Sequence, residues 1–224
     1  TDGRLALGRE AAHAVRRVLH ARDATGREIG RTLWRKVGRH PRLAVVDQAS
    51  VVQLVSDDGR CVGARFRDRT GTLSEARSLA TLLATGGAGR LYRETTNPPV
   101  ATGDGLAIAY RGGARVADLE FIQFHPTALD VDGQPRSLLS EALRGEGAKL
   151  INELGAPFMH DVDPAGDLAP RDRLAREVVR EMQKTGGGVY LSLDDLTPAF
   201  VHERFPHISG MCREIGLDLA RDRI

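Results

Sequence analysis

One stretch gives the main indication of the fold: Leu79-Ala80-Thr81-Leu82-Leu83-Ala84-Thr85-Gly86-Gly87. Its first part is a short, largely apolar run, which is typical of a buried strand. The run ends in a Thr-Gly-Gly turn, and such a turn lets the backbone approach a dinucleotide closely. The turn also fits the ordinary end of a strand, because the chain lacks the complete GxGxxG fingerprint of a dinucleotide-binding fold.

Several short strands are predicted on either side of this stretch. Three of them form an antiparallel meander, because Asp58-Gly59 and Arg69-Thr70-Gly71 are turn sequences that separate β-like runs. The predicted meander strands are residues 50–55, 61–66 and 73–77. Residues 43–47 and 114–124 are further β-like runs, one on each side.

Helices are expected where a capping signal precedes apolar residues at helical spacing and where glycine or proline follows. This pattern occurs in four segments and again after Thr197-Pro198, where Pro206 interrupts the last helix. The four segments lie between Asp23 and Pro41, at residues 104–111, at residues 137–144, and from Pro170 to Gly186. The organisation changes near residue 115, from mixed strands and helices to a helix-rich part.

Composition and charge exclude several classes of protein. The 224 residues carry 32 basic and 30 acidic side chains without a basic run, and only 4% are aromatic, so nucleic-acid binding is disfavoured. Cys61 and Cys212 lack metal-ligand spacing, so we expect no metal and no disulfide framework. Without a signal peptide or an apolar run of membrane-spanning length, we expect no membrane partner and a cytoplasmic location. Both ends indicate a piece of a longer protein.

A polar cluster lies in three segments of the second half. These are Gln123-Phe124-His125-Pro126-Thr127, Ser140-Glu141-Ala142-Leu143-Arg144 and Ala169-Pro170-Arg171-Asp172. An arginine fork at a helix start can clamp a carboxylate. A glutamate between two arginines could pass a proton in a dry pocket. We therefore expect a pocket for a small dicarboxylate with a proton relay behind it.

Each of these residues also has a structural interpretation. Arg171 fits a surface ion pair with Asp172. Glu141 and Arg144, three residues apart, fit a helical ion pair that contributes little to stability. A lone histidine such as His125 is more often structural than functional. Only the combination favours the functional interpretation.

Taken together, these motifs resemble the flavoprotein family of L-aspartate oxidase, succinate dehydrogenase and fumarate reductase. The resemblance extends from about Leu5 to Ile224 and is most similar to the L-aspartate oxidase branch. Its most specific stretches are Ala84-Thr85-Gly86-Gly87, Thr102-Gly103-Asp104-Gly105, Gln123-Phe124-His125-Pro126-Thr127 and Glu141-Ala142-Leu143-Arg144-Gly145-Glu146-Gly147. The branch is indicated by Arg9-Glu10 followed by His13, and by Leu168-Ala169-Pro170-Arg171-Asp172.

The resemblance implies FAD-dependent oxidation of L-aspartate to iminoaspartate, with hydride transfer to the flavin. Oxygen or fumarate would reoxidise the flavin, and quinolinate synthase would take the product toward NAD. Two alternatives stay open. One is a succinate dehydrogenase or fumarate reductase flavoprotein subunit, which Glu10 and Pro170 disfavour. The other is a catalytically inert capping-domain fragment, since the first dinucleotide fingerprint is missing.

The resemblance also implies roles for individual residues. Arg171 would be the proton donor and acceptor, with Glu141 and Arg144 as the relay. Glu10, which is uninformative by itself, would bind the substrate amino group, because a carboxylate is the natural partner of an ammonium. The substrate carboxylates would be held by His125, Thr127 and Ser140. The FAD contacts would be Ser50, Val51 (through its backbone), Thr85, Gly86, Gly87, Asn97 and Asp104.

The implied fold class is α/β. Residues 1–118 would be part of a Rossmann-like FAD-binding domain with an inserted β-meander. Residues 119–224 would be an α+β capping domain that carries the substrate and relay residues.

Overall fold

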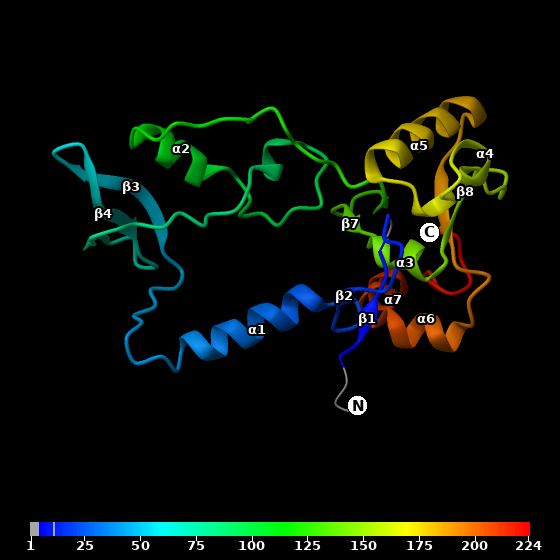
Figure 1. The fold of residues 1–224 in the computed structure, drawn as a ribbon, viewed down its shortest axis with the longest axis horizontal. Coiled ribbons are helices and arrows are strands. Elements are labelled where there is room, and N and C mark those ends of the chain that lie inside the picture. Colours follow the sequence, from blue (N-terminus) through cyan, green and yellow to red (C-terminus); the bar gives the residue numbers. More distant parts are fainter. Residues whose placement is uncertain (1–4, 11) are drawn as a thin grey trace. The chain divides into compact units, whose positions relative to one another are not determined.

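The computed structural model describes residues 5–10 and 12–224, and its internal contacts divide the chain into two compact units (Figure 1). The first unit contains residues up to 33 together with residues 125–224. The second unit contains residues 34–124. None of the described helices has the length and apolar character that a membrane crossing requires.

The second unit is built on a three-stranded antiparallel sheet in the order β3-β4-β5. The strands are β3 (Ser50–Asp57), β4 (Arg60–Arg67) and β5 (Leu73–Arg77), so the predicted meander is confirmed. Asp58 and Gly59 join β3 to β4 with φ values of 45° and 73°. A tight hairpin turn with two positive φ angles favours this Asp-Gly pair.

Helix α2 (Asp104–Arg111) packs against the meander, and a short 3-10 turn, η1 (Gly89–Leu91), precedes it. A Cβ built on Gly112 would lie 2.9 Å from Leu54 Cδ1 of β3, so glycine at this position lets the end of α2 approach the sheet. The predicted helix at residues 104–111 and its end at Gly112 are confirmed.

The prediction of a buried strand at residues 79–84 is wrong. The segment has no regular secondary structure, and the side chains of Leu79 and Leu82 are 99% and 90% exposed. The strands predicted at residues 43–47 and 114–124 are also absent. An apolar run forms a strand only where another strand pairs with it, and no described strand pairs with these segments. All described strand pairs are antiparallel, so the Rossmann-like part of the prediction is not confirmed.

The first unit combines three short antiparallel strand pairs with helices. The hairpin β1 (Leu7–Gly8) and β2 (Val18–Leu19) comes first, and helix α1 (Thr25–Val37) follows it and runs on into the second unit. The remaining elements are β6 (Ala128–Leu129), β7 (Ser137–Leu138), α3 (Glu141–Glu146), β8 (Lys149–Asn152), α4 (Met159–Val162), η2 (Gly166–Leu168), α5 (Arg171–Thr185), β9 (Val189–Ser192), α6 (Pro198–Arg204) and α7 (Pro206–Glu214).

The local signals predicted these helices well. Pro170 is the N-cap of α5, and Gly186 ends that helix with a φ of 71°. Pro206 separates α6 from α7, as expected. The helix predicted at residues 137–144 is wrong in its first half, because residues 137–138 form β7 and Ser140 has the extended conformation of an N-cap.

A contiguous hydrophobic core lies in the first unit. Leu143, Leu174, Val201 and Phe205 have no exposed surface, and they come from α3, α5, α6 and the junction of α6 with α7. The burial of these side chains fixes α3 and α5 relative to each other. The polar residues at the starts of these two helices therefore have a rigid support.

Candidate active site

Helix α3 holds two of the predicted catalytic side chains. Ser140 caps the helix, because its Oγ accepts the N–H of Ala142 at 3.2 Å. Glu141 occupies the first helical position, and Arg144 follows one turn later on the same face. Both side chains are buried, which an isolated helical ion pair on a surface would not be.

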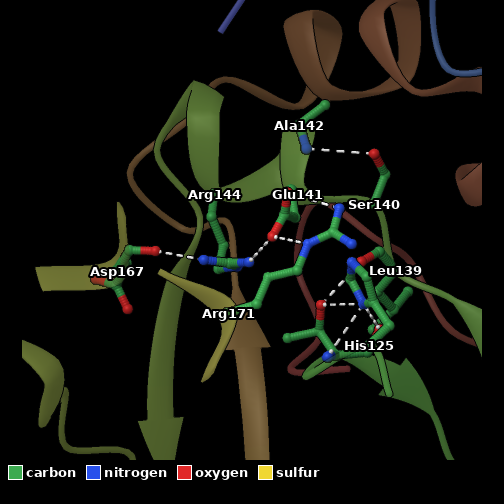
Figure 2. Close-up of polar contacts among 9 residues, drawn as sticks. His125, Leu139, Ser140, Glu141, Ala142, Arg144, Asp167 and Arg171 are labelled. Carbon is green, nitrogen blue, oxygen red and sulfur yellow. Dashed lines mark hydrogen bonds and ion pairs between the residues drawn. The ribbon is translucent and has the colours of Figure 1, made fainter. Parts of the chain in front are cut away.

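Arg171, at the start of α5, completes a chain of ion pairs with these residues (Figure 2). Arg171 Nε and Nη2 donate to the two carboxylate oxygens of Glu141 at 2.7 and 3.0 Å. Arg144 Nη2 donates to Oε1 of the same carboxylate at 3.2 Å. The expectation that Glu141 lies between two arginines is confirmed. Arg171 therefore pairs with Glu141, while Asp172 pairs with Arg176.

Asp167 holds the far end of this chain, a role that was not predicted from the sequence. Its carbonyl oxygen accepts Arg144 Nη1 at 2.6 Å, and its carboxylate accepts the N–H of Leu150 at 2.8 Å. The Arg144 side chain is fully buried, and its Nε has no hydrogen-bond partner among the described residues. Asp167 lies outside the three motif segments, so no local signal marks it.

His125 lies next to these ion pairs (Figure 2) and forms a compact turn with Thr127. His125 Nδ1 lies 2.8 Å from the carbonyl oxygen and 3.2 Å from the amide nitrogen of Thr127. The Thr127 hydroxyl donates to Leu139 O at 2.8 Å. These contacts orient the imidazole ring, so Nε2 is the nitrogen that would meet a ligand.

The charges in the site perturb several pKa values. Burial would raise the pKa of Glu141, but the hydrogen bond and charge of Arg171, with the charge of Arg144, hold it below its ordinary value. The hydrogen bond to Glu141 raises the pKa of Arg171, and the negative charges of Glu141 and Glu10 add to this effect. Burial lowers the pKa of Arg144. Burial also lowers the pKa of His125, as does the charge of Arg171.

Glu10 lies close to the same helix. A Cβ built on Gly145 would be 1.9 Å from Arg9 O and 3.2 Å from Glu10 Cα, so only glycine fits beneath this segment. The Arg9 side chain also approaches Gly145 O, at 3.4 Å. The structure therefore places Glu10 in the same compact unit as the other predicted substrate and relay residues, which are His125, Thr127, Ser140, Glu141, Arg144 and Arg171. The predicted domain division had assigned Glu10 to the FAD-binding domain.

The predicted FAD contacts all lie in the second unit. Gly103, the N-cap of α2, donates its N–H to Gly87 O at 3.2 Å, which ties the Thr-Gly-Gly loop to the start of that helix. A Cβ on Gly105 would lie 1.7 Å from Thr85 Oγ1, and one on Gly89 would lie 2.4 Å from Asn97 Nδ2. The structure thus brings Thr85, Gly86, Gly87, Asn97 and Asp104 into one region. Ser50 and Val51 lie at the first two positions of β3 and are exposed.

Residues 1–223 match the family described as FAD binding domain. The chain belongs to this FAD-binding domain family. Membership gives FAD as the cofactor, which confirms that prediction. The loop at Gly86 and Gly87 fits a dinucleotide, because a Cβ on either glycine would meet no atom within 4 Å and the backbone is open to a ligand.

Curated relatives in several organisms are named L-aspartate oxidase. The protein of Synechocystis is 45% identical over 98% of this chain and 41% of its own length. The protein of Nostoc is 44% identical over 98% of this chain and 39% of its own length, and that of Bacillus subtilis is 40% identical over 99% and 41%. The chain therefore spans about two fifths of the length of these relatives.

Solved structures show the same fold. A quinol-fumarate reductase with menaquinol molecules superposes with a TM-score of 0.89 at 32% identity, and the match covers 100% of this chain and 42% of that one. The Mycobacterium smegmatis Sdh1 complex with UQ1 gives a TM-score of 0.69 at 31% identity, covering 100% and 40%. The member of the FAD-binding domain family described here therefore has the flavoprotein fold of succinate dehydrogenase and fumarate reductase.

Proposed function

We propose that the protein containing this chain oxidises L-aspartate to iminoaspartate with FAD. The ion-pair chain from Arg171 through Glu141 to Arg144 carries the proposal, because it joins a carboxylate-binding fork to a buried proton path. The identity of 40–45% to curated L-aspartate oxidases supports the choice of substrate.

In this proposal the substrate carboxylates meet the neutral and cationic donors of the first unit. The Ser140 hydroxyl already accepts the N–H of Ala142, so its own hydrogen remains for a carboxylate. Thr127 acts mainly by orienting His125, since its hydroxyl donates to Leu139 O. Glu10 would bind the substrate ammonium, which succinate lacks.

Proton transfer would run through Arg171. A guanidinium alone is a poor base, because its pKa lies above about 12. Here its Nε lies 2.7 Å from Glu141 Oε1, so a proton taken at Arg171 can be passed on to the carboxylate in the same step. The hydrogen bond and charge of Arg171, together with the charge of Arg144, keep Glu141 ionised, so its carboxylate can accept this proton.

Bound FAD supplies the acceptor for the hydride from the substrate α-carbon. The residues that would hold it are Ser50, Val51, Thr85, Gly86, Gly87, Asn97 and Asp104. We further propose that oxygen or fumarate reoxidises the flavin, and that the reactive imine product is consumed by a quinolinate synthase.

We also propose the domain division inferred from the sequence, with residues 1–118 in a Rossmann-like FAD-binding domain and residues 119–224 in a capping domain. The second unit contains the predicted FAD residues, and the first contains the predicted substrate and relay residues, which supports this division. By their internal contacts, residues up to 33, including Glu10, belong to the same compact unit as the proposed capping domain.

A second candidate is a succinate dehydrogenase or fumarate reductase flavoprotein subunit. The TM-score of 0.89 to a quinol-fumarate reductase favours it. The purified full-length protein separates the two candidates by steady-state turnover with L-aspartate and with succinate. Preference for L-aspartate supports the proposal, and preference for succinate supports the second candidate.

A further inference from the structure

Glu146, the last residue of α3, is a buried carboxylate between two arginines, and the proposed mechanism does not use it. Arg16 Nη1 and Nη2 donate to its two oxygens at 2.9 and 2.5 Å, which is a bidentate pair. Arg204 Nε, at the end of α6, donates to Oε1 at 3.2 Å. The side chain of Glu146 is only 3% exposed, whereas that of Arg16 is 54% exposed.

Arg16 belongs to the loop that carries Glu10. This loop, residues 9–17, joins β1 to β2, in which Gly8 pairs with Val18 (Figure 1). The N–H of Arg17 donates to Gly8 O at 3.1 Å and closes the loop at its base. The contact of Arg16 with Glu146 on α3 therefore fixes the end of this loop that leads into β2.

Arg204 contacts the hairpin directly as well. Its Nη1 donates to Arg22 O at 2.8 Å, just after β2. A Cβ on Gly8 would lie 3.1 Å from Arg204 Nη2, so this guanidinium packs directly on β1. Glu146 thus joins both ends of the hairpin to α3 through two different arginines.

The first part of the loop, which follows β1, docks close to α3 and Asp167. The N–H of Ala12 donates to Leu168 O at 2.9 Å, next to Asp167. Arg9 and Glu10 also approach Gly145 of α3 closely. Both docking points adjoin residues of the ion-pair chain, so the position of Glu10 relative to Arg171 depends on how the loop is held.

We propose that Glu146 is a positioning residue that selects for an amino-bearing dicarboxylate, because its contacts with Arg16 and Arg204 hold the Glu10 loop on α3. The inference rests on the proposed function. Loss of the Glu146 carboxylate releases the loop but leaves Glu141, Arg144 and Arg171 in place. Turnover of a dicarboxylate without an ammonium group is then largely retained.

The experiment compares full-length wild-type protein with Glu146→Gln and Arg16→Met. Steady-state kcat/KM is measured for L-aspartate and for succinate, and hydrogen exchange is measured for the amides of residues 12–20. We expect each variant to lose about tenfold or more in kcat/KM for L-aspartate and less than about twofold for succinate, with faster exchange in the loop. Arg16→Met is included because Arg16 is half exposed and Glu146 keeps Arg204 as a partner, so we expect this variant to disturb the fold less than the loss of the buried carboxylate.

Glu75→Gln is the matched control, since Glu75 also bridges two arginines, Arg65 and Arg77, but in the meander. It should change neither substrate's kcat/KM. Equal losses for L-aspartate and succinate, or unchanged kinetics and loop exchange in Arg16→Met, would overturn the positioning role. Wild-type protein without L-aspartate turnover would overturn the proposed function itself, and the selectivity role with it.

Discussion

Arg171 and Glu141 face each other across 30 residues of sequence, with Nε 2.7 Å from Oε1 and Nη2 3.0 Å from Oε2. This two-point contact joins the first turn of α5 to the first turn of α3. It orients the guanidinium and also offers it a proton acceptor. The following predictions depend on this contact or on the structure that supports it.

Replacing Arg171 by Lys should reduce kcat for L-aspartate by about a hundredfold or more, because lysine has no planar fork to contact substrate and Glu141 together. FAD content, measured by flavin absorbance, should stay close to that of the wild type. The control is Arg176→Lys, an exposed arginine on the same helix. Near-normal turnover of Arg171→Lys would remove Arg171 from the reaction.

Replacing Glu141 by Gln should lower the thermal midpoint at neutral pH, because it removes the carboxylate that forms an ion pair with the buried Arg144. The folded-state pKa of Glu141 is depressed, so its contribution is present above the unfolded-state value of about 4.3 and is lost as pH falls through the folded value. The difference in midpoint between wild type and variant should therefore narrow on acidification below about pH 4. A difference that is constant with pH would contradict the ionised pair.

His125 should make a separate contribution to the pH dependence of the free energy of unfolding. Its folded-state pKa is lowered, so the unfolded chain binds a proton more readily once the pH falls below the ordinary value of about 6.5. Stability should therefore decrease through this range in the wild type and less in His125→Gln. Histidine ring resonances followed by NMR during a pH titration give the direct check, and a His125 pKa at or above its ordinary value would contradict the prediction.

Replacing Gly145 by Ala should displace the Glu10 segment, because the new Cβ would lie 1.9 Å from Arg9 O. We expect about a tenfold lower kcat/KM for L-aspartate and unchanged FAD content. Gly30→Ala in α1 is the control, since a Cβ there meets no atom within 4 Å and should be neutral or slightly stabilising. Full activity of Gly145→Ala would mean that the segment does not depend on this approach.

Replacing Phe205 by Ala should destabilise the first unit by about 3–5 kcal/mol, because the side chain has no exposed surface. Phe200→Ala, at a position that is 40% exposed, should cost much less. Chemical denaturation, followed by far-ultraviolet circular dichroism, measures the free energy of unfolding of both variants. Equal effects of the two substitutions would contradict the location of the core.

The sequence predicted those elements whose signals are local. Helices α2 and α5 have glycine or proline caps at both ends, α6 and α7 each begin at a proline, and the meander turns at Asp58-Gly59. The strand at residues 79–84 failed because its formation depends on a pairing partner elsewhere, and no described strand supplies one.

The candidate site likewise contains residues that local motifs predict and residues that only the folded chain reveals. Glu141, Arg144 and Arg171 lie in motifs, so they could be predicted from the resemblance. Asp167 binds Arg144 through a backbone carbonyl, which any residue type possesses. The partner of Glu146, Arg16, lies 130 residues away, and only the folded chain brings the two together.

An anaerobic titration of the purified full-length flavoprotein, followed by its visible absorbance, tests the oxidation of L-aspartate by bound FAD most directly. We expect L-aspartate to bleach the flavin band and an equal concentration of succinate to do so far less. Bleaching by succinate but not by L-aspartate would contradict it.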